Sequence, residues 1–207
     1  MQQKVLTNEV ARKIGEHIII PEGYREIGTK AFYSRNMISV HIPEGVTTIG
    51  EAAFHFCENL EYVNIPKSMM HIGRNAFDKC NRLQTITIPS DTISIGEAAF
   101  CNKGLQSIEV DENNPYYSSE DGILFNKDKT TLLAYPSQRK RPFYLVPSSV
   151  TEIADCDRMA DIGQIFIPAS VTKIGDDAFL GGIVMSIQTT LRIQARMGTC
   201  LIKIKPI

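Results

Sequence analysis

A block of 22 or 23 residues recurs four times in succession, and this recurrence constrains the fold more than any other feature of the chain. Every block holds an Ile-Pro step, an Ile-Gly pair and an Ala-Phe pair at fixed spacing. The prolines that open the blocks are Pro21, Pro43, Pro66 and Pro89. A period of this length is typical of a solenoid, in which one repeat cannot bury its apolar face alone and has to stack on its neighbours. The spacing therefore predicts an extended array of coils.

Each block predicts two short strands. Before each proline apolar and polar residues alternate, as where Asn64 separates Val63 from Ile65. A period of two is typical of a half-buried strand, and proline ends it because it cannot donate to the sheet. A second strand is expected before the Ile-Gly pair. The glycine there either takes a backbone angle closed to other residues or lets the next coil approach closely.

Stacking in register predicts files of identical side chains. One file is Phe32, Phe54, Phe77 and Phe100, and another is Ile27, Ile49, Ile72 and Ile95. Cys57 and Cys80 each lie three residues after the repeat Phe. Free Cys behaves as a small buried hydrophobe, so we predict interior thiols. A strand spacing of about 5 Å would also permit a disulfide between them.

The recurrent pattern is Ile-Pro-x-Gly/Ser-Val-x-x-Ile-Gly-x-x-Ala-Phe-x-x-Cys-x-x-Leu-x-x-Ile. It covers Ile18 to Val110 and resumes from Val146 to Phe179. This pattern resembles the BspA-like class of bacterial leucine-rich repeats. The fold expected from the resemblance is a β-rich α/β leucine-rich repeat solenoid, with a parallel strand ladder on the concave face and short strands or turns on the convex side. The resemblance also implies a cell-surface or secreted adhesion module that binds a host or extracellular matrix protein.

The repeat is interrupted between the fourth block and Val146. Two strands around a polar turn, 121–125 and 130–135, predict a β-hairpin insertion there. In the next unit Arg158 stands where Phe is expected and Ala154 replaces the Gly, so that unit is degenerate. The expected organisation is a capping segment 1–17, repeats 18–111, a hairpin insertion 112–142, repeats 143–187 and a closing segment 188–207.

The sequence lacks the residues that several classes of function require. A net charge of −1 gives no field to attract nucleic acid, and the basic run 139–141 is expected to be a solvated loop. No apolar stretch is long enough to insert in a membrane, and no signal peptide is visible in this chain. We expect no catalytic residues, no cofactor and no metal. The sequence has no phosphate loop, nucleophile elbow or His-x-x-x-His pair.

Candidate metal ligands are also poorly arranged. Cys101, Cys156 and Cys200 share no spacing, and no Cys-x-x-Cys pair occurs, so no zinc site is expected. Asp155, Asp157 and Asp161 lack the Gly and the distal Glu of a calcium loop and are expected to form a solvated turn.

The outward side of the strand ladder is the candidate binding surface. Its columns are Ser39, Tyr62, Thr85, Ser107 and Gln164, and beside them His41, Asn64, Thr87, Glu109 and Phe166. Solenoids bind partners on such extended faces, and Tyr adds apolar area with a polar handle. A merely solvated sheet face is the alternative, as is a spacer or intracellular scaffold whose recognition element lies outside this chain. The hairpin from Ile123 to Tyr135 is the second candidate for the binding site.

Overall fold

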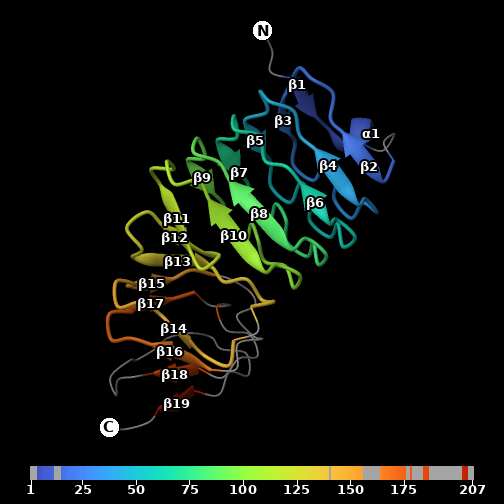
Figure 1. Cartoon of the computed structure of the whole chain (residues 1–207). Coiled ribbons are helices and arrows are strands. Elements are labelled where there is room, and N and C mark those ends of the chain that lie inside the picture. The colour runs from blue at the N-terminus through green and yellow to red at the C-terminus, as the bar shows by residue number, and fades with distance from the viewer. Residues whose placement is uncertain are drawn as a thin grey trace.

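The computed structural model describes residues 4–11, 15–139, 141–155, 164–175, 178, 184–186 and 202–204. Within them the chain winds into a stack of coils, and successive coils add strands to two parallel ladders (Figure 1). The predicted leucine-rich repeat solenoid is therefore confirmed. Expectations for Cys156, Asp157, Arg158, Asp161, Phe179 and Cys200, and for most of the closing segment, concern residues outside the described ones.

The first ladder contains the strands that precede the Ile-Pro steps. They are β2 (His17–Ile19), β4 (Ser39–His41), β6 (Tyr62–Val63), β8 (Thr85–Ile88) and β10 (Ser107–Val110). Strands β2, β4 and β6 form one parallel sheet, and β8 pairs with β10 in another. The ladder is thus interrupted between β6 and β8, whereas the sequence predicted a continuous one.

The second ladder contains the strands that precede the Ile-Gly pairs. They are β1 (Lys4–Leu6), β3 (Tyr24–Ile27), β5 (Thr48–Ile49), β7 (His71–Ile72) and β9 (Ser94–Ile95). All five pair in parallel, and their register aligns the predicted Ile file. The only helix among the described residues is α1 (Asn8–Ala11), which connects β1 to β2.

The glycine of the Ile-Gly pair is required by the close approach of neighbouring coils. Gly50, Gly73 and Gly96 do not adopt positive φ angles. A Cβ atom on Gly73 would lie 2.6 Å from the backbone nitrogen of Glu51 in the preceding coil. Of the two explanations that the sequence allowed, close approach is therefore the correct one.

The predicted Phe file is confirmed. The rings of Phe32, Phe54 and Phe77 are fully buried, with centroids 5.1 Å apart in each successive pair. Phe100 continues the file at 6.0 Å from Phe77, and each pair of rings is nearly parallel. Offset stacks of this kind contribute about 0.5–1.5 kcal/mol per pair beyond the burial itself.

The turns that carry the Phe file form a third hydrogen-bonded array. The residues two positions before and two after the Phe are left-handed, as at Lys30 (φ 54°) and Ser34 (φ 55°). This alternation directs the amide of Phe32 onto the carbonyl of Ala53 in the next coil at 2.8 Å, with equivalent bonds on either side. A left-handed non-glycine residue costs about 1–2 kcal/mol, and the bonds between coils offset that cost.

The two in-phase cysteines are free and buried, as predicted. The Cys57 thiol donates to the carbonyl of Phe32 at 3.0 Å, and the Cys80 thiol donates to that of Phe54 at 3.1 Å. Burial raises the pKa of Cys57 to about 12 and the pKa of Cys80 well above its usual range. Each thiol therefore joins one coil to the coil before it.

The insertion is a three-stranded antiparallel meander. Its strands are β11 (Tyr117–Glu120), β12 (Ile123–Asn126) and β13 (Thr131–Ala134). The predicted hairpin corresponds to β12 and β13, although Asp121 and Gly122 form a turn and do not belong to the strand. Strand β11 was missed because Tyr117–Glu120 has no apolar alternation. The hydroxyl of Tyr117 accepts a hydrogen bond from the amide of Ile95 in the preceding coil.

The meander separates two hydrophobic cores. Leu124 and Ala134 pack into the core of the first coils, whereas Ile123, Phe125 and Leu132 pack into the second core. Because both sides of β12 are buried, its sequence is apolar without alternation. The parallel pairing of β13 with β15 (Glu152–Ile153) carries the second ladder past the meander to β17 (Lys173–Ile174).

The first ladder also resumes after the meander. Its strands there are β14 (Tyr144–Leu145), β16 (Ile165–Ile167), β18 (Val184–Ser186) and β19 (Ile202–Ile204), paired in parallel in that order. Within the basic run before β14, Arg139 is not solvated as its charge predicted, whereas Arg141 is exposed. Both Arg139 and Arg141 pair with Asp121, and the Arg139 side chain is only 11% exposed.

Candidate functional site

The outward surface of β2, β4, β6, β8 and β10, here called the strand face, holds eight of the ten predicted residues. Pairing places His17 beside Ser39 and Ser39 beside Tyr62. On the other side of the interruption, Thr85 lies beside Ser107 and Thr87 lies beside Glu109. The inward residues between them, such as Val40 and Ile86, are buried in the core. This alternation fixes which side chains face outward.

Tyr62 is the largest of the predicted contact residues, and its side chain is open to solvent. Its side chain is 59% exposed, while the following Val63 is buried. The amide of Tyr62 donates to the carbonyl of Ile38 in the preceding coil at 3.3 Å, which ties its backbone to the ladder. A large exposed ring on an ordered strand loses little conformational entropy on binding.

Several predicted neighbours already have partners within the array. The Ser39 hydroxyl lies 2.9 Å from Nδ1 of His17. Asn64 donates to the carbonyl of Ile42 and accepts from its amide, both at 2.8 Å. Asn64 therefore joins two coils, and its amide is occupied within the protein. The sequence could not show this, because the bonding depends on the register of coils 22 residues apart.

The interruption between β6 and β8 opens a polar depression beside Thr85. Its volume is about 730 Å³. Arg82 pairs with Glu61 across it at 3.3 Å. The residues that line it are Glu61, Asn81, Arg82, Gln84, Thr85, Lys103, Gly104, Gln106 and Gln138. The sequence reasoning missed this feature because it assumed an unbroken ladder.

The far end of the predicted columns is displaced. Gln164 and Phe166 belong to β16 and its margin, beyond the meander, and have no pairing with β10. Phe166 instead packs edge-on against Phe143, with ring centroids 6.4 Å apart. The structure therefore does not bring these two residues together with the other eight.

Two residues of β2 extend the strand face and were missed. His17 and Ile19 are in register with Ser39 and His41, and the Ile19 side chain is 73% exposed. The signal was present in the sequence, because Ile18 and Ile20 point inward and their alternation places His17 and Ile19 outward. With Ile19 and Tyr62 both exposed, the strand face offers separate apolar contacts among small polar side chains.

Within the described ranges no group of three or more His, Cys, Asp or Glu residues is arranged to hold a metal ion. His55 lies on the turn side, where its Nε2 is 2.9 Å from Oδ2 of the buried Asp78. Burial lowers the pKa of His55, against an opposing contribution from Asp78. In the described part of the chain, no helix has the length and apolar character needed to cross a membrane.

The parallel strands and the repeat of 22 or 23 residues define this protein as a leucine-rich repeat solenoid. The chain belongs to the BspA-type leucine-rich repeat family, whose description, "BspA type Leucine rich repeat region", matches residues 12–122 in six copies. No curated protein matches the chain.

Solved bacterial structures share the fold. The pneumococcal vaccine antigen PcpA is 27% identical with a TM-score of 0.66, over 82% of this chain and 49% of that protein. A leucine-rich repeat protein from Eubacterium ventriosum is 22% identical with a TM-score of 0.57, over 86% of this chain and 62% of that one. A leucine-rich cell surface protein from Faecalibacterium prausnitzii is 21% identical with a TM-score of 0.50, over 84% of this chain and 70% of that protein. The chain thus spans about half of the pneumococcal antigen.

Proposed function

We propose that this protein is a non-catalytic binding module that recognises an extracellular partner protein through the strand face. The observation that carries the proposal is the exposed Tyr62 on an ordered strand, among small polar side chains. The fold is suited to protein binding, because solenoids present extended surfaces of this kind. Tyr is enriched among the residues that dominate interface energetics, where truncation costs about 2 kcal/mol or more.

The composition of the strand face supports a neutral interface. Its outward columns carry no Lys or Arg, and Glu109 is their only acid. The Ser107 hydroxyl donates to the Glu109 carboxylate, so this charge is partly satisfied within the protein. Thr85 and Thr87 are exposed and can pair with polar groups of a partner at modest desolvation cost. The affinity of the strand face for its partner should therefore depend only weakly on ionic strength.

Membership of the BspA-type family and similarity to PcpA support a role at the bacterial cell surface or in secreted form. A vaccine antigen has to be reached by antibodies, and PcpA is 27% identical to this chain. Adhesion to a host or matrix protein is the form of binding that fits such a position. A structural spacer is the second candidate function, and the regular stacking of coils supports it because each coil adds a fixed rise.

The test is binding of the purified protein to a panel of purified extracellular matrix and plasma proteins. The variant Tyr62→Ala with Thr85→Arg removes the exposed ring and adds a bulky charge to the strand face. The matched control, Tyr116→Ala with Thr172→Arg, makes the same changes at exposed residues outside that face. We expect the first variant to lose binding and the control to retain it, with unchanged thermal melts for both. Equal affinity of the two variants would exclude the strand face, and no binding to any panel member would favour the spacer.

A further inference from the structure

A second surface feature, a cavity, lies where the meander meets the resumed ladder. A cavity of about 240 Å³ opens between the β11–β12 turn and β14. The residues that carry the argument are Asp121, Ile123, Phe125, Arg141, Phe143 and Leu145, all of which line it. The volume is smaller than the roughly 300–1,000 Å³ of drug-sized ligand pockets. It suits one or two side chains of a peptide.

Strand β14 presents an open sheet edge to this cavity. Among the described residues it pairs with β16 alone, through the Tyr144 amide on the Gln164 carbonyl at 2.8 Å and the Val146 amide on the Phe166 carbonyl at 3.0 Å. In a parallel pair, alternate residues direct their N–H and C=O groups to opposite edges. Leu145 therefore directs its backbone groups away from β16, toward the side of the meander. An unpaired edge of this kind is a template for an added strand.

Exposed apolar side chains flank the open edge. Phe143 is 52% exposed and Leu145 is 58% exposed. Both line the cavity, whose inner wall includes the buried Ile123 and Phe125 of β12. Phe143 directly precedes β14 and Leu145 ends it, and two such large apolar side chains contrast with the mainly polar strand face. They provide a contact for an apolar side chain of a bound segment.

The charges around the cavity favour an anionic group. Asp121 is shared by two guanidinium groups, at 3.4 Å from Arg139 and 3.2 Å from Arg141. Glu120, the other acid on the cavity wall, is paired with Lys129 at 2.7 Å. Three cations thus pair with two carboxylates, and Arg141 is the cation that lines the cavity. Arg141, which is half-exposed and shares its acid, can donate a charge-assisted hydrogen bond to a second carboxylate.

Two buried polar atoms behind the cavity wall lack partners among the described residues. They are the hydroxyl of Tyr135 and Nη1 of Arg139. Tyr135 packs against the wall residue Tyr144 with ring centroids 5.0 Å apart, and Arg139 contacts the wall residue Asp121. A buried polar group without a partner costs about 1–3 kcal/mol. Both atoms are buried and neither residue lines the cavity, so they do not contact a bound segment directly.

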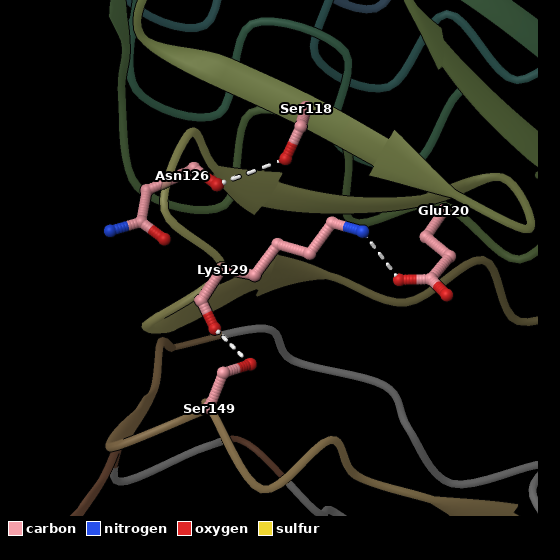
Figure 2. A network of polar contacts seen from close by, with 5 residues as sticks. All are labelled: Ser118, Glu120, Asn126, Lys129 and Ser149. Atoms are coloured by element: carbon pink, nitrogen blue, oxygen red, sulfur yellow. Dashed lines mark hydrogen bonds and ion pairs between the residues drawn. The ribbon is translucent and has the colours of Figure 1, made fainter.

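The wall is held in place by the meander itself. Figure 2 shows Lys129 reaching Glu120 across the sheet, while the Ser149 hydroxyl donates to the Lys129 carbonyl at 2.9 Å. The Ser118 hydroxyl donates to the Asn126 carbonyl at 3.1 Å and ties β11 to β12. The turn that carries Asp121 is thereby fixed relative to the resumed repeats before any ligand arrives.

We propose that this edge binds an extended acidic segment of a partner protein by strand addition to β14. The segment's backbone pairs with Leu145, its apolar side chain fills the cavity against Phe143 and Leu145, and its carboxylate binds Arg141. Main-chain pairing supplies affinity in this mode, and side-chain pockets supply specificity. The surface is separate from Tyr62 and Thr85, so it does not depend on the strand face being a binding site.

The test uses fluorescein-labelled hexapeptides in which Leu or Phe and Glu or Asp lie two positions apart, so that both point to one side of a strand. A matched set carries Gln or Asn in place of the acid. Fluorescence anisotropy should show at least tenfold tighter binding of the acidic set. Arg141→Ala should weaken that binding at least tenfold, and Leu145→Asp should abolish it.

Arg82→Ala is the control, since Arg82 is a similarly exposed, acid-paired arginine that lines the polar depression beside Thr85. It should bind the peptides as the unaltered protein does, and so should the Tyr62 and Thr85 double variant. Hydrogen exchange at the Leu145 amide should slow on peptide binding. Failure of every acidic peptide to bind, equal binding of the amide set, or full retention of binding by Arg141→Ala would each overturn the proposal.

Discussion

Replacing Phe77 by Ala should destabilise the array more than almost any other single change. The ring is fully buried and stacked on both faces, 5.1 Å from Phe54 and 6.0 Å from Phe100. Phe→Ala changes in cores cost about 3–5 kcal/mol. Phe32→Ala should cost less, by about 0.5–1.5 kcal/mol, because Phe32 has one stacked neighbour in the file. The expected difference between Phe77 and Phe32 comes from their positions in the file, because both rings are fully buried.

Urea unfolding followed by circular dichroism measures the effect. For a protein of this size, a loss of 3–5 kcal/mol should lower the midpoint by at least about 1 M. Tyr62→Ala, which removes an exposed ring from the same array, is the control and should leave the midpoint unchanged. Equal midpoints for Phe77→Ala and the unaltered protein would refute the stacking, as would a greater loss for Phe32→Ala than for Phe77→Ala.

Three further predictions concern the coil contacts. Gly73→Ala should lower the thermal midpoint markedly in a calorimetric scan, because its Cβ would lie 2.6 Å from backbone of the preceding coil; a neutral result would mean that the coils can separate at no cost. Cys57 and Cys80 should resist a thiol reagent until denaturant is added, and rapid native labelling would contradict their burial. Burial lowers the pKa of His55, so the folded state binds a proton at His55 less readily than the unfolded chain does. The free energy of unfolding, measured in urea, should therefore fall as the pH drops below about 6.5. His55→Gln should make this dependence of stability on pH weaker. An unchanged slope in the variant would remove His55 as the cause.

The sequence could predict the array because every core position repeats. The Ile and Phe files, the thiols and the resumed repeats all follow from one repeat spacing. Each repeat is therefore independent evidence for the same assignment of inward and outward positions. The alternation around Ile18 and Ile20 also placed His17 and Ile19 outward, but His17 was assigned to a cap and Ile19 was not included in the predicted columns.

The features that were missed depend on contacts between unlike segments. The gap between β6 and β8, the partner of Asn64 and the extra strand β11 are set by how one coil meets another, and no local pattern encodes them. The paired state of Arg139 was missed for the same reason. Its charge suggested a solvated loop, but its partner Asp121 lies 18 positions earlier, in the turn of the meander. The displacement of Gln164 and Phe166 follows from the meander as well, since it interposes a sheet that the repeat spacing does not include.

The most direct test of the central claim is photo-crosslinking from the strand face. A benzophenone amino acid is placed at residue 62, and in a separate protein at residue 33, where another exposed Tyr lies on the turn side. Each protein is irradiated with a binding member of the extracellular panel, and crosslinked peptides are identified by mass spectrometry. The account predicts saturable crosslinks from residue 62 that excess unlabelled protein competes away, and none from residue 33. Crosslinks from residue 33 alone, or equal crosslinks from both, would contradict recognition through the strand face.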